Sequence, residues 1–130
     1  MMTTRIDRMN WTTAFIIAAV VAVCFMIIKS GQISAKDALE KLKHGALVID
    51  VRSPGEFGSG HLATAMNIPL DDLETALPKR VPDKNQVLLL HCASGMRSGM
   101  AKSKLKSMGY PNAFNLDSYG RAESILKQVR

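Results

Sequence analysis

The distribution of apolar residues divides the chain into two unequal parts. From Trp11 to Ile28 no residue is charged and only two threonines are polar. A helix of this length is about 27 Å long, which is just enough to cross the hydrocarbon core of a bilayer. We therefore predict an N-terminal flank at 1–10, a transmembrane helix at 11–28, a linker at 29–33 and one folded domain at 34–130.

Two alternatives to a membrane anchor fit this segment less well. A cleaved signal peptide has a shorter apolar core and ends in a small-residue cleavage site, which residues 29–33 do not provide. A buried helix of a soluble protein would show a polar face, and this segment has none. The lysines after the segment outnumber the arginines before it, which favours a single-pass protein with its domain on the cytoplasmic side.

Ala14, Ala18 and Ala22 are four residues apart, so they share one face of the expected helix. Small residues at this spacing let two helices approach closely in a membrane. This face is a candidate contact for a homodimer or for another membrane protein. Alanine is also common in such segments, so the spacing can equally reflect composition alone.

Residues 34–130 alternate between apolar runs and segments with helical periodicity. The runs at 46–51 and 86–90 are almost continuously apolar, as in strands buried on both faces of a parallel sheet. Shorter strands are expected at 65–68 and 112–116. Helices are expected to begin at Ser34, Ser53, Asp71 or Asp72, Ser98 and Ser118, with Pro78 ending the third. Strands that alternate with helices predict an α/β fold with a central parallel sheet covered on both sides.

Charge and cysteine content narrow the function classes. The net charge of +6 would suit a nucleic acid or an anionic membrane surface. Because the lysines are scattered and few aromatics accompany them, we expect no nucleic-acid binding. Cys24 and Cys92 lie in different parts of the chain, so an intramolecular disulfide is not expected. The three histidines are isolated and no CxxC is present, so no metal site is expected.

The segment from His91 to Ser98 carries the candidate chemistry, because a cysteine follows a buried strand and precedes a helix. Backbone N–H groups of such a turn converge on one point, and the helix dipole adds partial positive charge. Both effects favour the thiolate of Cys92, so we predict a nucleophile with a lowered pKa. A buried structural cysteine would explain neither Gly95 nor Arg97. The predicted substrate-binding loop comprises Ala93, Ser94, Gly95, Met96, Arg97 and Ser98, with Arg97 as an oxyanion donor and Ser98 as the helix N-cap.

Three further residues are candidates for supporting roles. Asp50 and Arg52 follow the strand at 46–51, and ligands bind at the carboxyl ends of strands in such sheets. We expect Asp50 to be structural, whereas Arg52 suits either an ion pair or the site. For His61 a packed or hydrogen-bonded structural role is favoured over proton transfer. Glu56 is expected to pair with a nearby base.

Two motifs resemble the rhodanese-like single-domain sulfurtransferases, and the resemblance covers residues 32–130. One is Asp50-Val51-Arg52-Ser53-Pro54-Gly55-Glu56-Phe57 followed by Gly60-His61-Leu62, Ala65 and Asn67-Ile68-Pro69; the other is Cys92 to Arg97 followed by Ser98. The resemblance implies a three-layer α/β/α domain that needs no cofactor. It also implies that the Cys92 thiolate takes the outer sulfur of a donor such as thiosulfate or polysulfide. The resulting persulfide would pass that sulfur to a thiol acceptor.

The loop length separates sulfur transfer from phosphate chemistry. Four residues lie between Cys92 and Arg97, whereas the related phosphatases and arsenate reductases have five, which leaves room for a larger tetrahedral oxyanion. The shorter loop suits a sulfur atom bound on the cysteine, so we expect a sulfurtransferase.

Two departures from the family pattern keep a second function open. Ala93 stands where many thiosulfate-using relatives place a basic residue, and Met96 makes the rim more apolar. The region Asp117–Arg121 lacks the Gly-Gly-x-x-x-Trp ending of the family. The alternative is a membrane-anchored rhodanese-like binding or sulfur-carrier module with little turnover.

Overall fold

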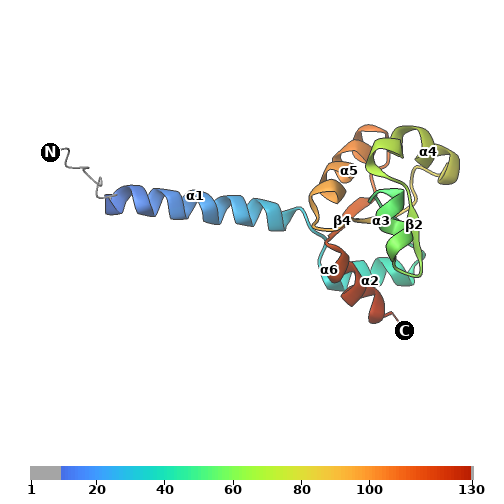
Figure 1. The fold of residues 1–130 in the computed structure, drawn as a ribbon, viewed down its shortest axis with the longest axis horizontal. Helices are drawn as coiled ribbons and strands as arrows, with labels where there is room; N and C mark the ends of the chain where they lie inside the picture. Colours follow the sequence, from blue (N-terminus) through green and yellow to red (C-terminus); the bar gives the residue numbers. More distant parts are fainter. Residues whose placement is uncertain (1–9, 130) are drawn as a thin grey trace. The chain divides into compact units, whose positions relative to one another are not determined.

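The computed structural model describes residues 10–129, and the chain divides into two compact units, Met1–Gly31 and Gln32–Arg130. The first unit contains one helix, α1 (Trp11–Ser30), which covers the predicted segment 11–28 (Figure 1). In the part of the chain that the structure describes, no helix combines the length and the apolar character needed to span a membrane. The transmembrane prediction is therefore not confirmed. Apart from Asn10, the predicted flank at 1–10 lies outside the described residues.

The second unit is built on a four-stranded sheet with the order β2-β1-β3-β4. The strands are β1 (Leu47–Asp50), β2 (Ala65–Asn67), β3 (Leu88–His91) and β4 (Ala113–Asp117). Every pair is parallel, which confirms the predicted sheet. Asp50 is in register with His91, and His91 with Asp117, so the ends of three strands meet at one edge.

Helices cover both faces of this sheet, as the alternation of apolar runs predicts (Figure 1). The helices are α2 (Ala35–Lys43), α3 (Pro54–Ser59), α4 (Leu73–Arg80), α5 (Met96–Ser107) and α6 (Tyr119–Lys127), with a 3-10 turn η1 (Leu70–Asp72). Ile49 packs with buried residues of α4 and α5, whereas its neighbour Val48 packs with those of α2 and α6. Because successive strand residues point to opposite faces, the sheet separates two apolar cores. The domain is therefore a three-layer α/β/α structure.

Serine residues begin three of the helices as expected. Ser34, Ser53 and Ser118 each accept a hydrogen bond from the backbone N–H three residues later. At α3 the Glu56 side chain returns the interaction to the backbone of Ser53, which completes a capping box. This box fixes the Glu56 carboxylate near the carboxyl end of β1.

Two predicted helix boundaries are wrong. Pro78 does not end α4, which continues to Arg80 with Val81 N–H bound to the carbonyl of Leu77 at 2.7 Å. The burial of Leu73, Leu77 and Val81 holds this short helix together despite the missing N–H of the proline. The helix after the cysteine starts at Met96 rather than at Ser98, and its N-cap is Gly95.

Candidate active site

The loop from Cys92 to Gly95 connects β3 with α5 and is held against the end of β4. The Cys92 N–H donates to the Asp117 carbonyl at 3.1 Å, and the Tyr119 N–H donates to the Ala93 carbonyl at 3.2 Å. Ser94 forms an isolated antiparallel bridge with Ser118. These backbone contacts fix the position of Cys92, which is completely buried.

Hydrogen-bond donors surround the sulfur of Cys92. The Gly95 N–H lies 2.9 Å from Sγ and the Ser98 N–H lies 3.4 Å from it, while Ser98 Oγ is 3.5 Å away. Burial raises the pKa of the Cys92 thiol, but hydrogen bonds from Ser98, Gly95 and Ser94 outweigh burial and bring the pKa below its ordinary value. Because the thiolate is the nucleophilic form, this agrees with the role predicted for Cys92.

Ser98 does not cap the helix, contrary to the expectation from the sequence. It lies in the first turn of α5 and is completely buried. Its Oγ lies 2.7 Å from Asn115 Oδ1, and the same amide oxygen accepts the Asp117 N–H at 2.8 Å. Asn115 thus holds Ser98 Oγ beside Sγ. Sequence reasoning missed Asn115, because an asparagine in an expected strand carries no distinctive signal.

Gly95 is required by both its backbone and its surroundings. Its φ of 100° lies in the left-handed region, and a side chain there would overlap the Asp117 carboxylate. Asp117 itself has φ of 79°, the only positive value at a non-glycine residue in the described chain. The two residues therefore fix the close approach of the loop to β4.

Arg97 forms an ion pair with Glu56, so its two outer nitrogens donate to that carboxylate rather than to a bound oxyanion. Its Nη1 lies 2.6 Å from Glu56 Oε1, and its Nη2 lies 2.9 Å from Oε2, which makes the pair bidentate. The hydrogen bonds from Arg97 hold the pKa of Glu56 at about 2. The expected pairing of Glu56 with a base is confirmed, and α3 is tied to α5 across the loop.

Asp50 and Arg52 form a second, buried pair behind the loop. Arg52 Nε lies 3.0 Å from both carboxylate oxygens, and Nη2 lies 2.8 Å from Oδ2 and donates to the Gly60 carbonyl. The Arg52 guanidinium stacks over the Tyr119 ring at 4.8 Å. Both residues thus bind each other and organise the strand end, which is the structural role considered for them.

His91 is a buried residue to which the sequence pattern assigns no role of its own. Its Nδ1 lies 3.4 Å from the Cys92 carbonyl, and its Nε2 has no hydrogen-bond partner among the described residues. Asp50 Oδ2 is the nearby charge, at 3.8 Å. Burial lowers the pKa of His91 more than Asp50 raises it. The imidazole directly before Cys92 is therefore neutral at pH 7.

The ring of His61 contacts Phe57 and not the Cys92 loop. Its ring stacks on Phe57 with centroids 3.8 Å apart, and Nδ1 hydrogen-bonds the Phe57 carbonyl at 2.9 Å. This supports the structural role. Of the remaining loop residues, Ala93, Ser94 and Met96 are exposed.

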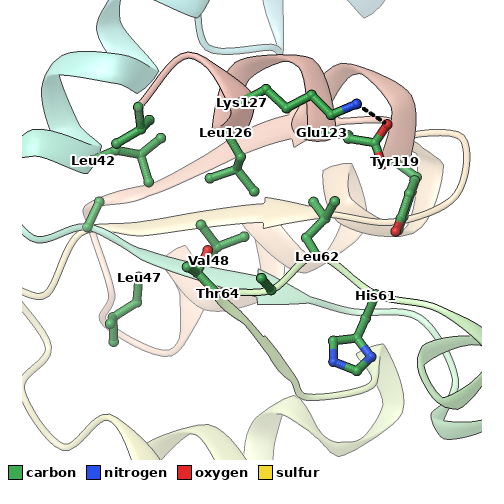
Figure 2. A pocket seen from close by; sticks show the side chains of 13 residues that line it. Leu42, Leu47, Val48, His61, Leu62, Thr64, Tyr119, Glu123, Leu126 and Lys127 are labelled. Carbon is green, nitrogen blue, oxygen red and sulfur yellow. Dashed lines mark hydrogen bonds and ion pairs between the residues drawn. The ribbon is translucent and has the colours of Figure 1, made fainter.

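A pocket of the domain lies apart from the cysteine loop. It has a volume of about 570 Å³ and lies between α2, α6 and the chain before β2. Figure 2 shows Leu42, Leu62 and Leu126 around it, with the Glu123–Lys127 ion pair at its edge. Across the described residues, no group of three or more His, Cys, Asp or Glu side chains is placed to hold a metal ion.

Comparisons with known proteins agree with this geometry. Residues 34–118 match the family of rhodanese-like domains. The chain is 40% identical over 67 residues to thiosulfate sulfurtransferase PspE of Escherichia coli, covering 52% of this chain and 64% of that protein. It is 35% identical over 79 residues to thiosulfate:glutathione sulfurtransferase of Saccharomyces cerevisiae, covering 51% and 55%. The matched segments thus span less than two thirds of these curated relatives.

A solved structure extends the comparison to the fold. The human single-domain sulfurtransferase TSTD1 superposes with a TM-score of 0.63 at 29% identity, covering 72% of this chain and 96% of that one. The family match takes in all four strands and the whole Cys92 loop, and the chain belongs to the family of rhodanese-like domains.

Proposed function

We propose that this protein transfers a sulfane sulfur from a donor such as thiosulfate to a thiol acceptor through a persulfide on Cys92. The observation that carries the proposal is the set of N–H groups around Sγ, from Gly95 at 2.9 Å and from Ser98 at 3.4 Å. These donors stabilise negative charge on sulfur, and the thiolate is the form that attacks a sulfur donor. The named sulfurtransferases among the relatives support the same class of reaction.

The reaction proceeds in two displacements. The Cys92 thiolate attacks the outer sulfur of the donor, so that a new S–S bond forms on Sγ while the S–S bond of thiosulfate breaks. Sulfite leaves with the electron pair of that bond. An acceptor thiolate then attacks the outer sulfur of the persulfide, and Cys92 leaves as a thiolate ready for the next cycle. Both steps exchange one sulfur atom and need no external oxidant or reductant.

Turnover with cyanide as the acceptor tests this proposal. The full chain, incubated with thiosulfate and cyanide, is expected to form thiocyanate, and Cys92→Ser is expected to abolish its formation. Cys24→Ser is the matched control, since Cys24 lies in α1 and outside the domain. Thiocyanate formation that survives Cys92→Ser would contradict the proposal. Cys92-dependent hydrolysis of an aryl phosphate would instead favour the phosphatase chemistry of the related proteins.

A second candidate is a sulfur-carrier module that loads one sulfur but turns over slowly. It is favoured by the bidentate Arg97–Glu56 pair and by the neutral Ala93, because both leave little positive charge for an anionic donor. A single-turnover experiment separates the two functions. A carrier forms the persulfide in stoichiometric amount, whereas its multiple turnover with small acceptors stays near the uncatalysed rate.

The single-pass membrane location, with the domain on the cytoplasmic side, stays a prediction. Its support is the apolar surface of α1, where Trp11 is 82% exposed and Phe15 69% exposed. Three consecutive apolar side chains, Phe15 to Ile17, are exposed, so the apolar surface is not confined to one face. Alkaline carbonate extraction of membranes tests the location: the full chain is expected to stay in the pellet, and Phe15→Lys/Val21→Lys to move to the supernatant. Extraction of the wild type would contradict it.

A further inference from the structure

The two arginines beside the cysteine loop are both occupied by carboxylates. Arg97 gives both of its outer nitrogens to Glu56, and Arg52 gives Nε and Nη2 to Asp50. Each pair is bidentate, so the charge of each guanidinium is already offset by a carboxylate that is held close by. Neither guanidinium is therefore free to neutralise a dianionic donor.

Three acidic residues lie near Gly95 or near Arg97. Asp117 reaches the backbone of Gly95 inside the loop. Asp71 and Asp72 share a hollow of about 310 Å³ with Arg97. None of these three carboxylates has a hydrogen bond or an ion pair among the described side chains. These three carboxylates therefore add negative charge that no ion pair among the described residues offsets, although the whole chain carries a net charge of +6.

The large exposed side chains that follow the loop are apolar. Met96 directly follows Gly95 and is 76% exposed, and Met100 lies one helical turn further on the same face and is 58% exposed. In the described part of the domain, Val129 is the only other large apolar side chain that is exposed. Methionine is flexible and polarisable, so this pair suits an organic group of varied shape.

We infer that Met96, Met100 and Asp117 select organic sulfane-sulfur donors with at most one negative charge, such as thiosulfonates and organic persulfides, over the thiosulfate dianion. This inference rests on the proposed sulfur transfer through Cys92 and specifies its donor. The organic substituent contacts the two methionines, where it loses apolar surface to water. The second negative charge of thiosulfate meets Asp117 with no unpaired arginine to offset it.

The chemical step balances for a thiosulfonate in the same way as for thiosulfate. The Cys92 thiolate attacks the outer sulfur, the Sγ–S bond forms, and the bond between that sulfur and the sulfonyl group breaks. The sulfinate leaves with the electron pair, and the persulfide remains on Cys92. With an organic persulfide the leaving group is the thiolate of the donor.

Donor competition in single turnover tests the inference. The full chain with Cys24→Ser is mixed with thiosulfate, methanethiosulfonate or benzenethiosulfonate, and the rate of persulfide formation is followed by mass spectrometry. Each rate is divided by the rate of the same donor with a free small thiol at equal thiolate concentration, which removes intrinsic reactivity. We expect benzenethiosulfonate to exceed thiosulfate by about tenfold or more, with methanethiosulfonate between them. We also expect the thiosulfate rate to rise with added salt, because screening weakens the repulsion.

Two variants and one control assign the effect to Met96 and Asp117. Met96→Lys is expected to shift the benzenethiosulfonate-to-thiosulfate ratio toward thiosulfate by about three- to tenfold. Ser103→Lys makes the same change of charge further along the exposed part of α5, and it is expected to leave the ratio within about twofold. Asp117→Asn keeps a residue that tolerates positive φ and is expected to raise the thiosulfate rate.

The possible outcomes separate failure of the donor assignment from failure of the proposed sulfur transfer. A normalised preference for thiosulfate, or an equal response to Met96→Lys and Ser103→Lys, would overturn the donor assignment while leaving sulfur transfer intact. Failure of all three donors to load Cys92 in the folded, reduced protein would contradict the proposed function itself.

Discussion

The Arg97 guanidinium and the Glu56 carboxylate form a bidentate ion pair that joins α5 to α3, with Nη1 2.6 Å from Oε1 and Nη2 2.9 Å from Oε2. The pair lies beside the Cys92 loop, and both side chains are a little more than one-third exposed. The ion pair stabilises the loop, but it also occupies the guanidinium that would otherwise bind an anionic donor. Stability at acid pH and donor choice are therefore linked through the same two residues.

The first prediction concerns stability in acid. The pKa of Glu56 is about 2 in the folded protein, below the ordinary value of 4.5, so the folded state favours the ionised form. Its contribution to stability is complete above pH 4.5 and is lost as the pH falls toward 2. In urea unfolding, Glu56→Gln is expected to lower the midpoint at pH 7 and to converge with the wild type near pH 2.

The matched control is Glu40→Gln, whose carboxylate makes only a longer contact of 3.7 Å with Lys43 on an exposed helix. It is expected to leave the midpoint at pH 7 nearly unchanged. Parallel curves for Glu56→Gln and the wild type between pH 2 and 4.5 would contradict the role given to the pair.

The second prediction concerns the reactivity of Cys92. Ser98→Ala removes the hydroxyl whose hydrogen bond lowers the pKa of the thiol, while the Gly95 and Ser98 N–H groups remain. The pKa of Cys92 is therefore expected to rise. The pH dependence of alkylation by iodoacetamide, measured with Cys24→Ser in the background, reports this shift. An unchanged inflection would show that the backbone donors alone set the pKa.

The third prediction concerns the close contact of Gly95 with Asp117. Gly95→Ala adds a side chain at φ of 100° and forces it against the carboxylate. We expect a loss of about 2–4 kcal/mol of unfolding free energy, together with loss of persulfide formation. Gly58→Ala is the control, because nothing lies within 4 Å of the added carbon. Equal stability of the two variants would contradict the requirement for glycine in the loop.

The fourth prediction concerns the buried imidazole of His91. Burial lowers the pKa of His91 below 6.5, so the unfolded chain takes up a proton at a higher pH than the folded protein does. The free energy of unfolding should therefore fall as the pH drops below 6.5. The loss of the Glu56 contribution to stability follows at lower pH. His91→Phe removes this slope, together with an Nε2 that has no hydrogen-bond partner in the described chain, and we expect it to be neutral or stabilising at pH 7. The same slope in His91→Phe would assign the effect to other groups.

Periodicity and cap residues predicted most of the architecture. The continuous apolar run at 46–51 identified a strand buried on both faces, and Ser53 with Glu56 marked the start of α3, because these signals act over a few neighbouring residues. Pro78 led to a wrong prediction for the end of α4, because the burial of Leu77 and Val81 outweighs the hydrogen bond that the proline removes. Local signals are reliable only where tertiary packing does not oppose them.

The position of Cys92 beside converging N–H groups was predictable, but its other surroundings were not. Cys92 stands out because a cysteine between a strand and a Gly-containing turn at a helix start is placed where backbone N–H groups favour the thiolate. The partner of Arg97 lies 41 residues earlier in the chain, and Asn115 lies 17 residues after Ser98, so no local pattern connects them. The positive φ of Asp117 likewise follows from the fit of β4 against the loop. Such long-range relationships shape the loop, and only the folded structure shows them.

The central claim is that Cys92 carries the transferred sulfur. The most direct measurement is the intact mass of the full chain with Cys24→Ser after incubation with thiosulfate, polysulfide and benzenethiosulfonate, beside the same chain with Cys92→Ser. We predict a gain of one sulfur atom with at least one donor, reversed by an added thiol and absent without Cys92. No gain with any donor, while the protein is folded and Cys92 is reduced, would contradict the account.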